Sequence, residues 1–320
     1  MGALRFLSGA LGVLLACAGQ ADPLRTDEDW LRTMAFAAHQ TNYSGVFVYQ
    51  SGPRVETSRI THWVDDEGEH EYLESLDGPK REVVRDNDKV WVIAGDKKIQ
   101  SRKRRGHFSF PALLPEQISA VHENYRVLQG EEDRVAGHHA HAIIFEPRDH
   151  LRYVRKLWAH SENGLVLKAQ VQDRQGIIIE QYAFTQLDIS AAPNRKWPSG
   201  ERPVAPVLQG EGLPSVAVSS TPSGWQVDAL PAGFRKVVEM RRTMPGRAEP
   251  VIHMVYSDGL AGISVFIERA AAEPEFHGLS SQGAVHVYNR LSGAHLITVV
   301  GEVPPRTVIQ VADSVRYAGQ

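Results

Sequence analysis

The sequence predicts a mainly β protein that carries a smaller α+β domain at its C-terminal end. Between residues 43 and 93, short runs of β-branched and aromatic residues alternate with turn residues, which is typical of consecutive strands. The same pattern returns between residues 139 and 187. Residues 191–224 are rich in proline, glycine and serine, which is the composition of a linker. We therefore expect a large antiparallel sheet within residues 22–190, a linker over residues 191–224, and a second domain over residues 225–318.

Five strands are expected in the first region. They are Tyr43–Tyr49, Arg59–Val64, His70–Leu76, Glu82–Arg85 and Val90–Ile93. Short turns such as Asp65–Gly68 join them, and connections of this length link antiparallel neighbours. In the first strand, Val46 and Val48 point to one face while Phe47 and Tyr49 point to the other. Both faces of the sheet should therefore be covered, one by a helix and the other by a loop or an apolar ligand.

A helix is expected immediately before the first strand, over Asp27–Asn42. Thr26 is its expected N-cap, and Asp29 three residues later completes a capping box. The helix has one apolar face, made by Trp30, Leu31, Met34, Ala35 and Ala38. We expect that face to pack on the sheet that begins at Tyr43.

A basic segment, Asp96–His107, follows the first five strands and is interpreted as a loop. Its cations are Lys97, Lys98, Arg102, Lys103, Arg104 and Arg105. Such a run is either a solvated surface or a site for lipid phosphates or an acidic partner. A short helix is expected at Pro115–Tyr125, with the proline at its start, and the acidic Glu131–Asp133 is interpreted as a solvated loop.

The remaining strands complete both domains. In the first domain they are expected at His139–Glu146, Leu151–Ala159, Leu165–Gln172 and Ile177–Leu187. In the second domain they are expected at Arg235–Arg242, Pro250–Tyr256, Gly262–Glu268, Val285–Arg290 and His295–Glu302, before a helix at Pro304–Val315. About nine strands with few helices favour a curved sheet or an open barrel for the first domain.

The N-terminus has the pattern of an export signal. Arg5 is followed by an apolar run from Phe6 to Ala18, and Ala21 ends a small-x-small cleavage site, so residues 1–21 are expected to be removed. The only cysteine, Cys17, lies in this segment, so the mature chain would have neither disulfides nor a cysteine nucleophile. Lipidation at Cys17 stays open as a minor alternative. A net charge of −3 and a pI near 6.5 give no indication of nucleic-acid binding.

The sequence contains little that indicates catalysis. Nucleophile elbows, zinc-protease motifs and phosphate-binding loops do not occur in it. His139 and His141 would share one face of a strand beside His138, but no further ligand lies at a suggestive spacing. We therefore expect no metal, no cofactor and no catalytic residue, and interpret the chain as a binding protein and not as an enzyme.

Segments spread over the whole mature chain resemble the RseB/MucB family, periplasmic regulators of the sigma-E envelope-stress pathway of Gram-negative bacteria. In the first domain these segments are Asn42–Tyr49, His62–Trp63, Leu76–Gly78, Arg81–Arg85, Glu146–Asp149, Arg152–Tyr153 and Phe184–Leu187. In the second domain they are Leu230–Phe234, Met240–Arg242, Tyr256–Leu260, Ser264–Glu268 and Thr298–Pro304. Each segment is short, and their order across two domains behind an export signal makes the resemblance specific.

The resemblance implies a fold and a function. The fold is an N-terminal open half of a β-barrel with packed helices, like that of the lipoprotein carriers LolA and LolB, followed by a smaller C-terminal α+β domain. The implied function is to bind the periplasmic region of a membrane-spanning anti-sigma factor of the RseA/MucA type. Bound in this way, the protein shields the anti-sigma factor from the site-1 protease DegS, and lipid signals such as lipopolysaccharide release it. The first domain would sense lipid, and the second would bind the anti-sigma factor.

Residue predictions follow from this function and from residue type. An apolar lipid site is expected to involve Trp30, Met34, Phe47, Tyr49, Trp63, Trp91 and Phe145. Lipid phosphates are expected to meet Arg102, Lys103, Arg104 and Arg105. The partner surface is expected to include Arg241, Arg242, Tyr256 and Phe266, because arginine and aromatic residues anchor interfaces. Plain hydrophobic core is the competing interpretation for each apolar residue.

Two further alternatives remain open at this point. A periplasmic lipid or lipoprotein carrier of the LolA type would have the same first domain, although a simple carrier has no second domain. Self-association through exposed sheet edges is a second possibility, so a homo-oligomer is also a candidate state.

Overall fold

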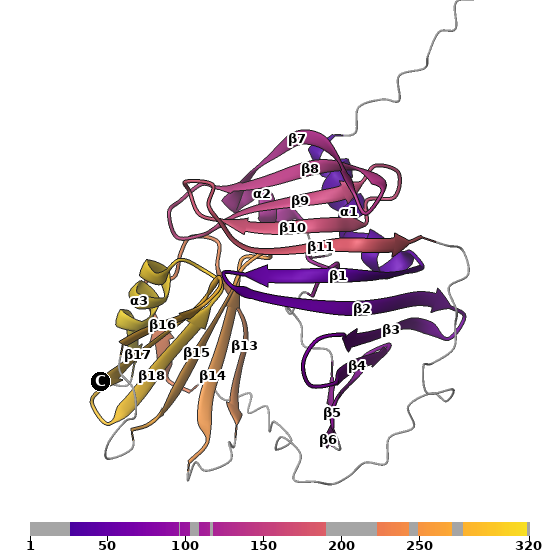
Figure 1. Ribbon diagram of the computed structural model, residues 1–320. Helices are drawn as coiled ribbons and strands as arrows, with labels where there is room; N and C mark the ends of the chain where they lie inside the picture. Colours follow the sequence, from indigo (N-terminus) through magenta and orange to yellow (C-terminus); the bar gives the residue numbers. More distant parts are fainter. Residues whose placement is uncertain are drawn as a thin grey trace, which may run out of the picture.

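Two antiparallel sheets form most of the protein in the computed structural model, which describes residues 26–95, 97–102, 109–115, 118–189, 223–242, 249–270 and 278–318. The first sheet has 11 strands and the second has 6 (Figure 1). The first sheet is open, because its edge strands β6 and β7 lie at opposite ends of the strand order. The predicted fold class, an open curved sheet with a smaller α+β domain behind it, is confirmed.

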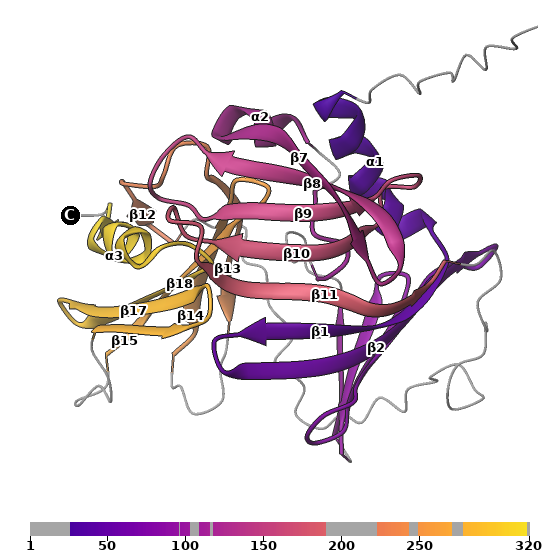
Figure 2. The same ribbon diagram turned by 45° about the horizontal axis from the view of Figure 1, so that its top comes forward.

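The first sheet consists of two meanders joined in the middle. One meander is β1 (Tyr43–Ser51), β2 (Arg54–Asp65), β3 (Gly68–Ser75), β4 (Arg81–Asp86), β5 (Lys89–Ala94) and β6 (Lys97–Arg102). The other is β7 (Tyr125–Val135), β8 (His138–Pro147), β9 (Val154–His160), β10 (Val166–Gln172) and β11 (Ile178–Asp188). β1 pairs with β11 in antiparallel register and so connects the two halves. Figure 2 shows the resulting curvature, with β1 and β2 continuing the surface formed by β8 to β11.

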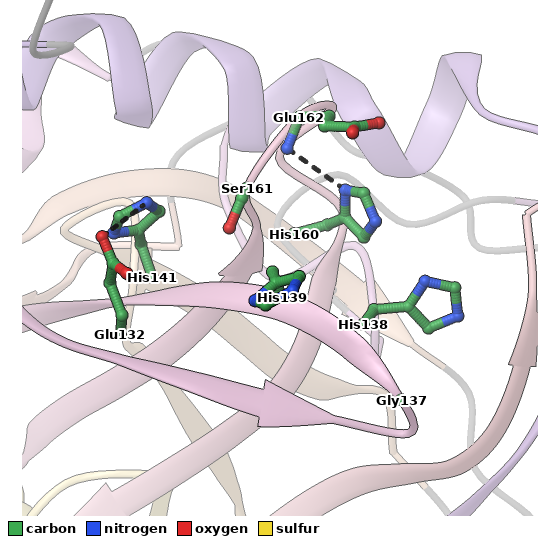
Figure 3. Close-up of a pocket in the computed structure, with 8 residues that line it drawn as sticks. All are labelled: Glu132, Gly137, His138, His139, His141, His160, Ser161 and Glu162. Carbon is green, nitrogen blue, oxygen red and sulfur yellow. Dashed lines mark hydrogen bonds and ion pairs between the residues drawn. The ribbon is translucent and has the colours of Figure 1, made fainter. Parts of the chain in front are cut away.

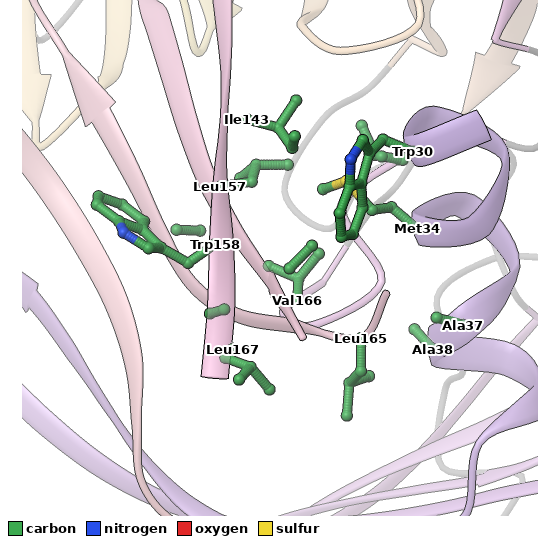
Figure 4. Close-up of a cluster of buried hydrophobic side chains, with 14 of the residues drawn as sticks. Trp30, Met34, Ala37, Ala38, Ile143, Leu157, Trp158, Leu165, Val166 and Leu167 are labelled. Carbon is green, nitrogen blue, oxygen red and sulfur yellow. The ribbon is translucent and has the colours of Figure 1, made fainter. Parts of the chain in front are cut away.

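Helix α1 (Asp27–Gln40) begins as its sequence predicts. The Thr26 hydroxyl accepts the backbone N–H of Asp29 at 3.2 Å, and the Asp29 carboxylate accepts the backbone N–H of Thr26 at 3.1 Å. The apolar side of the helix packs on the second meander. Figure 4 shows Trp30 and Met34 facing Ile143, Leu157 and Val166, while Trp158 points away from the helix.

The second domain is a six-stranded sheet with one helix on it. Its strands are β13 (Arg235–Arg242), β14 (Val251–Ser257), β15 (Gly262–Arg269), β16 (Gly278–Gln282), β17 (Val285–Ser292) and β18 (His295–Gly301). The strand order is β13-β14-β15-β18-β17-β16. Helix α3 (Pro305–Asp313) packs its Val308 and Val311 against Ile263, Val265 and Val299 in one buried cluster. A two-stranded pair, β12 (Trp225–Val227) with β19 (Val315–Tyr317), completes the domain.

The structure corrects four sequence predictions. The expected basic loop contains an edge strand, β6, although Lys103 to Arg105 lie outside the described residues. The expected acidic loop at Glu131–Asp133 is part of edge strand β7. The helix expected from Pro115 begins only at Ser119, as α2 (Ser119–Asn124). The short strands β12, β16 and β19 were not predicted. The expected export signal and nearly all of the expected linker lie outside the described residues.

Candidate functional site

A group of aromatic rings covers the centre of the first sheet and is its most distinctive apolar feature. The aromatic cluster consists of Phe47 and Tyr49 from β1, Tyr182 and Phe184 from β11, and Phe110 from the segment before α2. Ring centroids of Phe110 lie 5.1 Å from Phe47, 5.0 Å from Phe184 and 5.5 Å from Tyr182. Offset and tilted contacts at these distances are the favourable arrangement for aromatic pairs.

The aromatic cluster belongs to the same continuous core as the face of α1. That core buries Trp30, Met34, Phe47 and Phe145, and the partly buried ring of Tyr182 packs against it. Tyr49 is joined to the cluster because its ring centroid lies 4.7 Å from that of Tyr182. The structure thus brings together five of the seven residues that the sequence assigns to an apolar site.

The other two residues, Trp63 and Trp91, lie on the opposite face of the sheet. The strand register explains this. Phe47 of β1 pairs with Ser58 of β2, so the Ser58 side chain lies on the same face as Phe47. Because side chains alternate along a strand, Ile60 and His62 share that face. Trp63 is therefore on the other face, where its ring stacks on His70 at 5.1 Å. Trp91 shares that face in a separate buried cluster with Tyr72 and Val84.

Sequence reasoning did not select three residues of this site, Phe110, Tyr182 and Phe184; the last two lie in a strand that was expected, whereas Phe110 does not. The apolar run from Phe108 to Leu114 was noted only as a connection to the next helix. In the structure Phe110 is 6% exposed and Leu114 is 3% exposed, and both belong to the main core. A loop with several large apolar residues, in a chain whose first strand is apolar on both faces, is the sequence pattern that could have indicated the burial of Phe110. This segment lies on the same side of the sheet as α1, because Phe110, Phe47 and the helix residue Trp30 share one core. The expectation that a helix and a loop or ligand would cover opposite faces is therefore wrong.

A second candidate site is a histidine-lined cavity at the end of the second meander (Figure 3). Its volume is about 570 Å³, and its lining consists of Glu132, Gly137, His138, His139, His141, His160, Ser161 and Glu162. The ring centroids of His138 and His160 lie 5.4 Å apart, and His141 Nε2 lies 3.8 Å from a carboxylate oxygen of Glu132. Four of the protein's 14 histidines therefore meet in one place.

The hydrogen bonds of His160 constrain what this cavity can hold. Its Nδ1 accepts the backbone N–H groups of Glu162 at 3.3 Å and Asn163 at 3.5 Å, so the neutral ring carries its proton on Nε2. Burial lowers the pKa of His160, and the neighbouring His138 lowers it further. Within the described residues, no group of three or more histidine, cysteine or acidic side chains is placed to hold a metal ion. The cavity is therefore a polar cluster beside the imidazole of His160, whose lowered pKa favours the neutral ring.

The partner residues expected in the second domain divide between the two faces of its sheet. Tyr256 is 2% exposed and belongs to the core beneath α3, whereas Phe266 and Arg242 lie on the opposite face. The ring of Phe266 stacks on His253 with centroids 4.2 Å apart, and Arg242 Nη1 donates to His253 Nδ1 at 3.3 Å. Arg241 is exposed on edge strand β13 and points to the α3 side. Figure 1 shows α3 on one side of this sheet only, so Phe266 and Arg242 mark a face over which no described helix lies.

The two domains meet through a buried polar junction. Arg152 Nε donates to Asp258 Oδ2 at 2.5 Å, and the hydroxyl of Tyr125 donates to the same oxygen at 2.9 Å. Arg152 also binds the Asp149 carboxylate and the backbone carbonyl of Ala232. The side chains of Arg152 and Asp258 are 1% and 0% exposed. Burial alone would lower the pKa of Arg152, but the hydrogen bond and charge of Asp258 outweigh it and raise that pKa.

A second set of contacts extends the junction toward the outer strands. Arg155 Nη2 donates to Glu302 at 2.6 Å, and the hydroxyl of Thr307 donates to the backbone carbonyl of Leu151 at 2.9 Å. Tyr153 and His286 are joined by a hydrogen bond of 2.8 Å. Each of these three hydrogen bonds joins a residue of the first domain to one of the second, so the domains are held in a defined relative orientation.

The first domain is an open sheet with an aromatic face, and buried polar contacts hold it against a second sheet domain. These features are those of a two-domain binding protein. Comparison with known families gives the particular one. The MucB/RseB N-terminal domain model matches residues 26–202, and the MucB/RseB C-terminal domain model matches residues 219–316. The chain belongs to the MucB/RseB family.

Relatives of this family are similar along almost their whole length. The sigma factor AlgU regulatory protein MucB of Pseudomonas aeruginosa is 33% identical over 295 residues, which is 90% of each chain. The sigma-E factor regulatory protein RseB of Escherichia coli is 29% identical, covering 90% of this chain and 89% of the relative. Among solved structures, MucB in complex with MucA(peri) is similar with a TM-score of 0.71 at 29% identity, over 92% of this chain and all of that one. A second MucA/MucB complex, from Pseudomonas aeruginosa, gives a TM-score of 0.73.

Proposed function

We propose that this protein binds the periplasmic region of an RseA/MucA-like anti-sigma factor, shields it from a DegS-like site-1 protease, and so keeps a sigma-E-type factor inactive. The observation that carries the proposal is the similarity, over both domains, to MucB, which has been solved in complex with MucA(peri). Both family models match, so the binding partner of the family transfers to a chain that has both of its domains.

The location proposed for the protein is the periplasm. Its relatives are named regulatory proteins of sigma factors, and the structure of one contains a region labelled periplasmic. No helix in the described part of the chain is long and apolar enough to span a bilayer. The export pattern of residues 1–21 supports the same location. The protein acts there by binding and not by catalysis.

The partner surface proposed is the face of the second sheet that carries Phe266 and Arg242. A partly exposed guanidinium beside a stacked aromatic ring is the composition of an interface anchor. Tyr256 contributes to this surface only indirectly, as core beneath the sheet.

Replacing Phe266 with alanine is expected to weaken binding to the periplasmic region of the anti-sigma factor by about 2 kcal/mol, or roughly 30-fold, because the variant loses a central aromatic contact. Isothermal titration with the purified periplasmic region measures this. Leu279→Ala is the matched control, since Leu279 is an exposed apolar residue on the opposite, α3-side face of the same sheet, and it should change the affinity less than threefold. Equal affinities for Phe266→Ala and the wild type would remove this face from the interface.

The second part of the proposal is that the aromatic cluster admits an acyl chain, as a lipid or lipopolysaccharide signal that promotes release of the partner. Acyl chains gain about 0.8 kcal/mol for each methylene buried. The cluster offers Phe47, Tyr182 and Phe184 on a curved sheet, covered by the single segment that carries Phe110. The cations at Arg102 to Arg105 are proposed to meet the lipid phosphates. A carrier of the LolA type would use the same cluster, but the junction with a second domain favours a regulator.

A further inference from the structure

A hairpin of the second domain inserts into the first domain beside the aromatic cluster. The hairpin joins β16 to β17, and its turn residue Ala284 is fully buried against Tyr153 and Val171 of the first domain. The turn fits closely: at Gly283, with φ of +60°, a Cβ atom would lie 2.5 Å from Ser51 Oγ. Glycine is required there both for the backbone conformation and for the space. The turn is therefore closely packed against the first domain.

Glu180, on β11 of the first domain, joins that turn to the aromatic cluster. One of its carboxylate oxygens accepts the backbone N–H of Ala284 at 2.8 Å, and the other accepts the hydroxyl of Tyr49 at 2.8 Å. Glu180 is 5% exposed. A buried carboxylate is stable only when donors replace water, and these two hydrogen bonds supply that replacement for Glu180.

The surroundings of Glu180 raise its pKa above the usual value for a glutamate, and burial is the largest cause. Burial raises the pKa of Glu180, and the bonds from Tyr49 and Ala284 lower it. Glu302 of the second domain also raises this pKa, whereas Arg155 lowers it. Arg155 and Glu302 are themselves paired at 2.6 Å. The charged groups around Glu180 thus come from both domains, and the Tyr49 hydroxyl is the donor that comes from the aromatic cluster.

Tyr49 is placed to respond to whatever occupies the aromatic cluster. Its ring is tilted against Tyr182, and Tyr182 in turn stacks on Phe110 with ring planes only 13° apart. An acyl chain that displaced Phe110 would remove the ring against which Tyr182 packs, and so disturb the contact that positions Tyr49. The chain of contacts is Phe110, Tyr182, Tyr49, Glu180 and Ala284.

We propose that Tyr49 and Glu180 form a relay through which occupancy of the aromatic cluster loosens the β16–β17 hairpin of the second domain. Moving Tyr49 removes one of the two donors of a buried carboxylate, which disfavours its charged form. The neutral carboxyl is a weaker acceptor for the Ala284 amide, so the turn is freed from the first domain. The coupling is reciprocal, so a partner that holds the second domain in its docked orientation disfavours the ligand. This inference rests on the proposed acyl site, and it names the residues by which that site reaches the partner-binding domain.

Hydrogen exchange of the Ala284 amide in the full chain tests the relay, with Tyr49→Phe as the variant. Phenylalanine keeps the ring but cannot donate to Glu180. Tyr72→Phe is the matched control, because Tyr72 donates to Glu82 at 2.7 Å on the opposite face of the sheet. Without ligand, Tyr49→Phe should speed exchange at Ala284 about tenfold, the equivalent of one hydrogen bond, while Tyr72→Phe should leave it unchanged. Unaltered exchange in Tyr49→Phe would overturn the relay.

A second arm adds a myristoyl lysophospholipid below its critical micelle concentration, with its affinity measured by titration calorimetry. In the wild type the probe should speed exchange at Ala284. In Tyr49→Phe, where the turn is already loosened, the probe should bind at least as tightly, by reciprocal coupling, but add no further increase. Binding to the wild type without any change at Ala284 would refute the relay and leave the acyl site intact. Failure of the probe to bind the wild type would refute the acyl site and, with it, the input to the relay.

Discussion

Replacing Arg152 with methionine is expected to lower the free energy of unfolding by about 3–5 kcal/mol, the cost of breaking a buried ion pair by removing one partner. The loss is large because the Asp258 carboxylate, whose side chain is 0% exposed, would be left without its cationic partner. Tyr125 would remain as a donor to Asp258, but a single phenol does not replace a guanidinium. Urea denaturation followed by tryptophan fluorescence and circular dichroism measures the change.

Two comparisons make this result specific to the junction. Arg126→Met breaks the ion pair with Glu146, whose partners are 61% and 40% exposed, and should cost less than about 1 kcal/mol. Adding Asp258→Asn to Arg152→Met should recover part of the loss, since the uncompensated buried charge is then removed. If Arg152→Met and Arg126→Met were equally destabilised, the buried junction would not be holding the domains together.

The second large effect is expected at Phe110. Phe110→Ala should cost about 3–5 kcal/mol of unfolding free energy, because it empties a space lined by three aromatic rings. Phe36→Ala is the matched control, as Phe36 on α1 is 38% exposed, and it should cost well under half as much. Thermal denaturation of both variants beside the wild type gives the comparison.

The same variant also tests whether the aromatic cluster is the acyl site. In Phe110→Ala a small alkyl ligand should fill the space left by the ring and restore stability by about 2.7 kcal/mol at one hundred times its dissociation constant. The wild type should gain less, since Phe110 occupies that space. Equal stabilisation of both proteins, or of neither, would argue that the acyl chain binds elsewhere.

Most strands of both sheets could be predicted from the sequence, because each has its own run of apolar residues and its own turns. In the first sheet, the two edge strands β6 and β7 were missed for a physical reason. β7 is exposed at every position from Leu128 to Arg134 and contains three consecutive acidic residues, so most of it has no alternation to detect. β6 carries Lys97 and Lys98, and lysine is a residue that protects sheet edges from pairing with other chains. In the sequence alone, a charged edge strand therefore looks the same as a charged loop.

The candidate site was predictable only in part. Residue type selected Trp63 and Trp91 together with Phe47, but the register between neighbouring strands placed Phe47 on one face and both tryptophans on the other. Phe110 was overlooked because its burial depends on where a loop crosses the sheet. Arg152 and Asp258 are separated by 106 residues, so no local pattern indicates that they meet. Contacts of this kind are set by tertiary structure and leave no periodicity in the sequence.

The most direct test is a cleavage assay with purified components. The periplasmic region of the RseA/MucA-like protein encoded in the same genome is incubated with an activated DegS-like protease, with and without an equimolar amount of this protein. We expect the protein to slow cleavage strongly and lipopolysaccharide to restore it. Cleavage at the same rate in the presence and absence of the protein would contradict its role as a shield of the anti-sigma factor.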